Sequence, residues 1–208
     1  SFVSASYLEK LMKYKYLITH SLLSSYEWMF KLENGKEEFL QALQRTPKHQ
    51  TKEMLNGTVF ENMVTAYAGG AELIDGHEWN KGIVSIGNQC RGGVFQVKSD
   101  REITIGNTTL VCYGIADNIK AGVIRDIKMV NSYTYGKYFE STQHPMYFYI
   151  FPECSKFDYL VFDGKEVWNE TYYRDDTPPI HYTIRNFLNF LEKQNLLETY
   201  FTFWKSKY

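Results

Sequence analysis

The chain has 208 residues, a formal net charge of −1 and three cysteines. This length fits one domain and is enough to bury a hydrophobic core. The near-neutral net charge does not indicate a nucleic-acid-binding protein, although a local basic groove can lie on a neutral protein. No apolar run reaches the roughly 18 residues that a membrane span needs, and we find no secretory signal pattern. We therefore expect no membrane partner.

The cysteines, Cys90, Cys112 and Cys154, are widely spaced and form no Cys-x-x-Cys pair. This spacing argues against a zinc ribbon or an iron–sulfur cluster. An odd number of cysteines without a pairing pattern is typical of a reducing compartment, so we predict a cytoplasmic location.

The N-terminal part, residues 1–50, is predicted to be helical, with Ser4 or Ser6 capping the first helix. A longer helix follows, and Gly69-Gly70 ends it. On this longer helix Val59, Met63, Val64 and Tyr67 recur at helical spacing and are expected to form its apolar stripe. The helices of this half of the chain are expected at residues 4–32 (one or two helices), 37–45 and 51–68.

The period of the apolar pattern then changes, because short runs rich in β-branched residues alternate with Gly and Asn. A meander of four strands is expected at residues 83–86, 94–97, 110–116 and 123–130. After it we expect a helix over 137–150, a hairpin over 159–168 with an Asp163-Gly164 turn, and a C-terminal helix at about 180–206. This order predicts an α+β fold, a sheet with helices packed on it.

The central hairpin of this meander carries the most informative residues of the chain. Asp117 is expected to end one strand and Asp126 lies within the next, so the two carboxylates can lie across from each other. Asp126 and Lys128 are two residues apart on a strand and point to one face. Ile127 points into the core, while its backbone carbonyl can still face a metal. Converging carboxylates cannot all stay ionised without a cation, and hard oxygen ligands suit Mg²⁺.

Two helices add side chains to this site. Glu61, on the long helix, is the third candidate carboxylate. Gln143 and Tyr147 are four residues apart on the next helix and share one face. Gln143 can bond to Lys128, to a metal-bound water or to a phosphate, and Tyr147 can pack behind it or contact the substrate backbone.

The residue types favour chemistry on a phosphodiester. One or two Mg²⁺ ions between Asp117, Asp126 and Glu61 would lower the pKa of a bound water and stabilise charge on the phosphorane. Lys128 would orient or deprotonate that water, or neutralise the transition state. Four nearby cations could hold flanking phosphates, although the carboxylates and Lys128 are the main candidates for the site: Lys120, Arg125, Lys137 and Arg91.

A lone Asp-x-Lys triplet carries little information, and the chain contains a second one at Asp163-Gly-Lys165. Gly164 marks that triplet as a hairpin turn. His144, beside Gln143, is expected to be an exposed or capping histidine rather than a ligand. The interpretation rests on the order of the motifs along the chain.

Four motifs of the chain resemble those of the PD-(D/E)XK nuclease superfamily, and within it the lambda-exonuclease and RecB-like branch. They are Gly57-Thr-Val-Phe-Glu61, Gly114-Ile-Ala-Asp117, Asp126-Ile-Lys128 and Gln143-x-x-x-Tyr147. The resemblance covers about residues 51–165. It implies a restriction-endonuclease-like core, a central mixed β-sheet flanked by helices in an α/β/α sandwich-like arrangement, and Mg²⁺- or Mn²⁺-dependent DNA cleavage. It further implies metal binding by Glu61, Asp117, Asp126 and the Ile127 carbonyl, with Lys128 catalytic and Gln143 supporting. Asp126 stands where many members have Glu.

This resemblance implies a single nuclease domain over residues 1–208, acting as a DNA exonuclease in recombination, repair or phage replication, in a bacterial or phage-infected cell. The same site would serve a structure-specific or restriction-type endonuclease. There are two other hypotheses: a non-catalytic member of the superfamily that binds DNA or protein, and an unrelated α+β domain with these residues on its surface. DNA is the expected partner, and the resemblance also allows a homo-oligomer and a recombination or replication protein.

Overall fold

The computed structural model describes residues 14–206, so the predicted caps Ser4 and Ser6 lie outside the described part. The helices are α2 (His20–Trp28), α3 (Gly35–Leu43), α4 (Lys52–Ala68), α5 (Asn80–Cys90), α6 (Gln143–Ile150), α7 (His181–Lys193) and α8 (Leu197–Phe203), with a 3₁₀ turn at Arg174–Asp176. The strands are β1 (Tyr16–Ile18), β2 (Val94–Ile105), β3 (Thr108–Lys120), β4 (Val123–Met129), β5 (Lys156–Phe162) and β6 (Val167–Tyr173).

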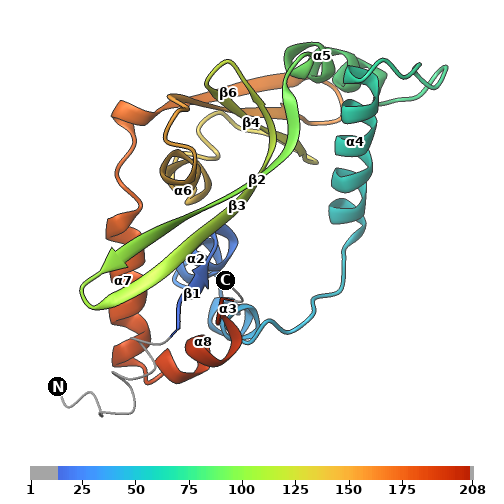
Figure 1. The fold of residues 1–208 in the computed structure, drawn as a ribbon. Helices are drawn as coiled ribbons and strands as arrows, with labels where there is room; N and C mark the ends of the chain where they lie inside the picture. The colour runs from blue at the N-terminus through green and yellow to red at the C-terminus, as the bar shows by residue number, and fades with distance from the viewer. Residues whose placement is uncertain (1–13, 207–208) are drawn as a thin grey trace.

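The strands of the described chain form one mixed six-stranded sheet in the order β1-β3-β4-β5-β6, with β2 paired to β3. β1 runs parallel to β3 and β4 parallel to β5, whereas the other neighbours are antiparallel. Figure 1 shows β2 and β3 as a long ribbon that extends well beyond β4, with α4 and α5 on one side of the molecule and α6 on the other. The expected α+β fold, with a mixed sheet flanked by helices, is confirmed.

Successive residues of β5 separate two hydrophobic cores. Phe157, Tyr159 and Val161 belong to the larger core, and Leu160 and Phe162 to the smaller one. Because side chains alternate across a strand, the two cores lie on opposite faces of the sheet. The structure is therefore layered, with helices covering both faces.

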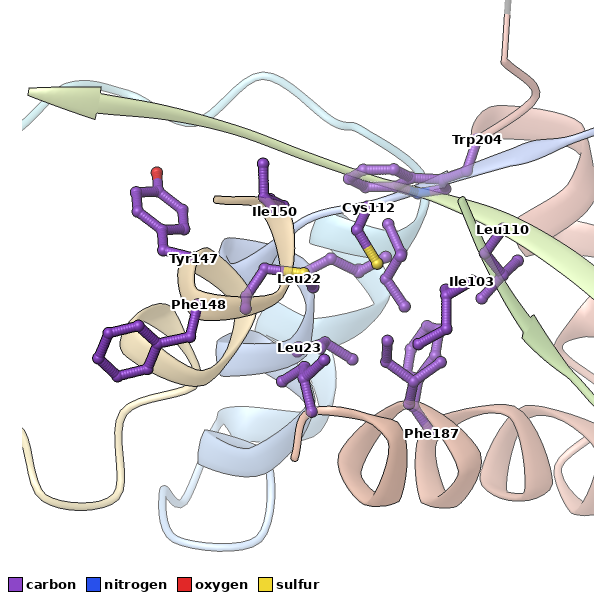
Figure 2. Packing of buried hydrophobic residues seen from close by; sticks show 14 of the residues in the cluster. Leu22, Leu23, Ile103, Leu110, Cys112, Tyr147, Phe148, Ile150, Phe187 and Trp204 are labelled. Carbon is purple, nitrogen blue, oxygen red and sulfur yellow. The ribbon is translucent and has the colours of Figure 1, made fainter. Parts of the chain in front are cut away.

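The larger core is built by α2, α6 and α7 against the β2–β3 ribbon. Figure 2 shows Leu22 and Leu23 of α2 beside Phe187 of α7, with Ile103 and Leu110 of the ribbon close by. These five side chains are at most 2% exposed. Burial of these side chains, and of Met146 and Ile150 in the same core, anchors α2 and α6, which carry residues of the site described below.

The smaller core lies under α4 and α5. The Phe60 ring of α4 stacks on Phe162 of β5 with centroids 5.3 Å apart, and Val64 is also fully buried. The predicted helix over 51–68 is confirmed, and Thr51 caps it by accepting a hydrogen bond from the Met54 amide at 3.2 Å. The predicted stripe was wrong at Val59, which is 48% exposed, because the buried face of the helix runs through Phe60.

The predicted strand at residues 83–86 was wrong, because these residues lie in α5. Ile83, Ile86 and Cys90 are buried together, which is the three- and four-residue spacing of a helix face. Gly82 allows the close approach, since a Cβ there would lie 2.6 Å from the Phe162 ring. A four-residue run with three β-branched residues, Ile83-Val-Ser-Ile86, cannot distinguish a short buried strand from a helix segment.

The predicted helices at 4–32 also contain an error, because Tyr16–Ile18 forms β1 and pairs with Leu110–Cys112 of β3. Helix α2 begins only afterwards, where the Thr19 side chain accepts a hydrogen bond from the Leu22 amide at 3.3 Å. The short helix predicted after Asn34-Gly35 is confirmed as α3.

Two predicted helices in the second half have different bounds in the structure. The helix expected at 137–150 begins at Gln143, which places Pro145 in its first turn, where proline is tolerated. The expected C-terminal helix is divided into α7 and α8, and Asn195 between them has a φ of 56°. The late hairpin is confirmed, and no helix between residues 14 and 206 has both the length and the apolarity needed to cross a bilayer.

Helix α6 lies unusually close to β3. Tyr147 donates its hydroxyl hydrogen to the Ile115 carbonyl at 2.9 Å, and a Cβ on Gly114 would lie 2.7 Å from the Tyr147 ring. Gly114 therefore belongs to the motif for steric reasons, since a side chain there would push the tyrosine away from the strand.

We expect Gly114→Ala to lower the free energy of unfolding by about 1–3 kcal/mol, because the buried Tyr147 ring cannot move without losing its hydrogen bond. Urea unfolding would measure it. Gly57→Ala is the matched control, because a Cβ there meets nothing within 4 Å and alanine is the better helix former, by about 0.5–1 kcal/mol. Equal effects of the two substitutions would contradict this explanation.

Candidate active site

The site forms where β3 and β4 separate. Their pairing ends at Asn118 opposite Arg125, and the next residues on the two strands are Asp117 and Asp126. The Ile127 amide donates to the Asp117 carboxylate at 2.8 Å instead of to a strand backbone. Asp117 does not end its strand as predicted, because β3 continues to Lys120 and only its pairing with β4 begins beyond Asp117.

Asp126 and Lys128 lie on one face of β4, as their spacing predicted. Asp126 is buried, and one of its carboxylate oxygens is 2.8 Å from the Lys128 ammonium. The other oxygen accepts a hydrogen bond from the Gln143 side chain at 2.5 Å. Gln143 therefore bonds to the carboxylate rather than to Lys128, and it is buried rather than on the helix surface.

Glu61 approaches the same place from α4. It is half-buried, and both this burial and the nearby charge of Asp126 raise the pKa of Glu61. Gln96 of β2 donates to the Glu61 carboxylate at 2.6 Å. The structure thus brings together the three predicted carboxylates from three different elements.

Gln96 was missed by the sequence reasoning. Its neighbours Phe95 and Val97 pair with Asn118 and Ala116, so Gln96 lies opposite Asp117. Its φ of 52° lies in the left-handed region, which a residue other than glycine seldom adopts. Such strain gathers at functional sites, but a single glutamine in an alternating strand gives no sequence signal for it.

The charges of the site are unbalanced. Burial, followed by the charges of Asp126 and Glu61, raises the pKa of Asp117 well above its usual value. Burial opposes the charged form of Lys128, but Asp126 and Asp117 outweigh it and raise the pKa of the ammonium. One ammonium thus faces three carboxylates that repel one another, which is an environment that favours binding of a cation.

The donor set fits a hard divalent cation, because carboxylate oxygens are the ligands that Mg²⁺ prefers. Among residues 14–206, no three His, Cys, Asp or Glu side chains are already gathered at metal-binding distances. Each carboxylate instead accepts a hydrogen bond from a protein group, namely from Gln143, the Ile127 amide or Gln96. The Ile127 side chain packs into the smaller core, as predicted, so that only its backbone carbonyl is available to a metal.

His20, the first residue of α2, is a second residue that the sequence reasoning missed. Burial, together with the charge of Lys128, lowers the pKa of His20 to about 4. Its ring lies edge-on to Tyr147 with centroids 5.5 Å apart. A neutral imidazole is therefore held beside the carboxylates, and neutral imidazole is a common metal ligand. It begins a helix far from the motifs in sequence, so only the packing of α2 reveals it.

The other predicted residues of α6 have structural roles. Tyr147 is buried and bonds to β3, which is the packing role considered for it. His144 was expected to be exposed or capping, and this was wrong: it is buried, lies 3.0 Å from the Tyr159 hydroxyl and stacks on Tyr172. Burial lowers the pKa of His144 to about 4, so the ring is neutral.

A cavity of about 530 Å³ lies beside Lys128 and Gln143, and Lys137 and Tyr138 also line it. The segment that contributes Lys137 and Tyr138 is held by Glu170 of β6, which is 1% exposed. The Glu170 carboxylate accepts hydrogen bonds from four donors: the hydroxyls of Tyr133 and Tyr172 and the amides of Gly136 and Tyr138. No motif pointed to Glu170, because three of its four donors, from Tyr133, Gly136 and Tyr138, lie in the loop before α6, which has no periodic pattern.

The four cations predicted to bind phosphates do not all lie beside the carboxylates. Lys137 lines the cavity beside Lys128. Arg125 points to the opposite face from Asp126, and its charge and that of Lys120 act on Cys90 of α5. Arg91 instead donates to the Tyr67 carbonyl at 3.3 Å.

The second Asp-x-Lys triplet is a turn, as predicted. Asp163 accepts hydrogen bonds from the amides of Lys165 and Glu166 at 2.9 and 2.7 Å. Its other oxygen accepts from the Trp168 indole at 2.9 Å. The carboxylate is thus engaged in closing the hairpin.

Comparison with known proteins establishes the fold alone. The sequence matches no family model and no curated protein. Among solved structures, the chain is similar to one titled "Crystal structure of SSO0001", with a TM-score of 0.51 and 14% sequence identity over 91% of this chain and 85% of that chain. This likeness supports the α+β class of the chain and extends over nearly all of it.

Asp117→Asn should stabilise the metal-free protein at neutral pH, since the pKa of Asp117 is higher in the folded than in the unfolded chain. The wild-type protein therefore loses stability as the pH rises from about 4 through the raised pKa of Asp117, because the folded chain must then hold this carboxylate in its charged form. The asparagine lacks this loss and can still accept from the Ile127 amide.

Urea unfolding in EDTA at several pH values would measure the difference, which we expect to be about 1 kcal/mol or more at pH 7. Asp163→Asn, at the exposed turn, is the control for a general effect of charge. An Asp117→Asn protein less stable than the wild type at every pH would contradict the electrostatic description of the site.

Proposed function

We propose that this protein is a metal-dependent deoxyribonuclease of the PD-(D/E)XK type, with a restriction-endonuclease-like core, that degrades DNA as an exonuclease in recombination, repair or phage replication. The observation that carries the proposal is the Asp126–Lys128 pair, with Asp117 and Glu61 placed by two other elements close enough for their charges to interact with it. In a purely structural cluster, mutually repelling carboxylates would be an uncompensated cost.

The residues divide the work as follows. Asp117, Asp126, Glu61 and the Ile127 carbonyl would hold Mg²⁺ or Mn²⁺, which when bound supplies an activated water and stabilises charge on the phosphate. Gln143 fixes the Asp126 carboxylate through its 2.5 Å hydrogen bond. Gln96 fixes Glu61 in the same way. These contacts keep the acidic groups oriented before substrate arrives.

Lys128 acts as a cation in this proposal. Its raised pKa keeps the amine protonated at neutral pH, so it does not take a proton from water. Its position 2.8 Å from Asp126 instead places positive charge next to the scissile phosphate, where it offsets the charge that develops during cleavage. Of the roles open to Lys128, the proposal therefore assigns it electrostatic stabilisation of the transition state.

The cavity beside Lys128 supports exonuclease action over cutting within a duplex. It is lined by residues of α2, among them His20 and Ser24, and by residues of the segment before α6, among them Tyr138 and Ser141. A strand end can enter such a cavity, whereas a continuous duplex would have to lie outside it.

The test is incubation of the protein with labelled linear, closed circular and single-stranded DNA in Mg²⁺ or EDTA. We expect Mg²⁺-dependent loss of linear DNA with circles intact, and a loss of activity of at least about 100-fold in Asp117→Asn and Lys128→Ala. Nicked circles would instead indicate the endonuclease with the same site.

Asp163→Ala and Lys165→Ala are the matched controls, because they alter the other Asp-x-Lys triplet, and we expect normal activity in both. Circular dichroism would confirm that every variant stays folded. Lys128→Ala cutting at the normal rate would show that the site is wrongly assigned, and no cleavage of any DNA by the wild type in Mg²⁺ or Mn²⁺ would refute the proposed function.

A further inference from the structure

The cavity beside Lys128 is next to a second hollow. This second hollow has a volume of about 460 Å³ and is lined by Tyr26, Phe30, Thr183 and Asn186. Three side chains line both spaces, namely Glu27, Lys31 and Glu140. The two spaces therefore adjoin, and these three residues form the junction between them.

One ion pair spans the junction. Lys31 follows the end of α2, Glu140 lies in the segment before α6, and the ammonium and the carboxylate form a salt bridge across the gap. The two side chains are 44% and 72% exposed, so the pair is weak and opens at little cost. The Lys31 ammonium also lies 5.2 Å from the centre of the Trp28 ring.

Three large aromatic side chains that line these two hollows are exposed to solvent. Trp28 and Phe139 line the cavity beside Lys128 and are 51% and 74% exposed. Phe30 lines the second hollow and is 66% exposed. Exposed rings that border a concave surface mark an interaction site, and base stacking on aromatic side chains is the usual way of holding a single strand.

The charged residues differ between the cavity beside Lys128 and the junction, and this difference indicates where the phosphates and the bases of a single strand would lie. Lys128 and Lys137 line the inner cavity and can receive phosphates there. The junction carries two glutamates and one lysine, which disfavours a phosphate and favours bases stacked on Trp28 and Phe139. The cavity beside Lys128, at about 530 Å³, has the size of a small-molecule site. It can therefore admit a single strand but not a duplex.

We propose that the two hollows form one path for single-stranded DNA, which runs from Phe30 past Trp28 and Phe139 to Lys128 and opens when Lys31 separates from Glu140. This inference rests on the proposed nuclease function and adds the substrate form, an unpaired strand or a frayed end. The ion pair closes the path in the absence of DNA.

The experiment measures fluorescence anisotropy of a labelled oligothymidylate, and of a blunt duplex of the same length, with the full chain in EDTA so that no cleavage occurs. We expect the single strand to bind more tightly than the duplex. Phe139→Ala and Trp28→Ala should each weaken single-strand binding by about 5- to 100-fold. Glu140→Gln should strengthen it, because the substitution opens the junction and removes a negative charge.

Tyr135→Ala is the matched control. Tyr135 lies four residues before Phe139 and is 80% exposed, but it lines neither hollow, and we expect its removal to leave binding unchanged. Because the replaced rings are exposed, thermal unfolding of all these variants should match the wild type.

Unchanged binding in both Phe139→Ala and Trp28→Ala, an equal loss in Tyr135→Ala, or a duplex bound as tightly as the strand would overturn the path. A cleavage assay in Mg²⁺ separates this outcome from the function itself. DNA cleavage with binding that ignores Phe139 and Trp28 overturns only the path. Ring-dependent strand binding without cleavage supports the path and refutes the nuclease.

Discussion

The hydrogen bond from the Ile127 amide to the Asp117 carboxylate is the interaction on which the site depends. Beyond Asn118 and Arg125 the strands β3 and β4 part, and the backbone groups on their inner edges need other partners. Asp117 satisfies the Ile127 amide and Tyr147 satisfies the Ile115 carbonyl. The fork in the sheet therefore holds a carboxylate between the strands and draws α6 against it.

The fork also explains why the site is electrostatically unfavourable without a cation. Asp117 is held in place by the backbone, Asp126 is buried beside it, and Glu61 approaches from α4. The charges of Asp126 and Glu61 raise the pKa of Asp117, and the charge of Asp126 raises that of Glu61. Lys128 offsets only part of this charge. A protein tolerates such a cost at a site where a ligand relieves it, which is why the carboxylates, rather than any other cluster, carry the proposed function.

The sequence predicted the parts of the site that depend on local periodicity. The two-residue spacing of Asp126 and Lys128, the helix that carries Glu61 and the turn at Asp163 were predicted from local pattern. His20, Gln96 and Glu170 could not be predicted, because their contacts come from elements distant in the chain, and a strained φ or a buried carboxylate leaves no pattern of its own. The misassigned segments, Tyr16–Ile18 and Ile83–Ile86, are short and largely apolar, and only the neighbouring elements decide whether such a run becomes a strand or a helix.

Calorimetric titration of the metal-free protein with Mn²⁺ tests most directly whether the carboxylates at the fork form a cation site. The wild type should show saturable binding, and Asp126→Asn should weaken it strongly, because the substitution removes a charged oxygen ligand. Asp163→Asn, at the turn of the late hairpin, should bind as the wild type does. A wild type that binds no Mn²⁺, or an Asp126→Asn protein that binds it equally well, would contradict the account.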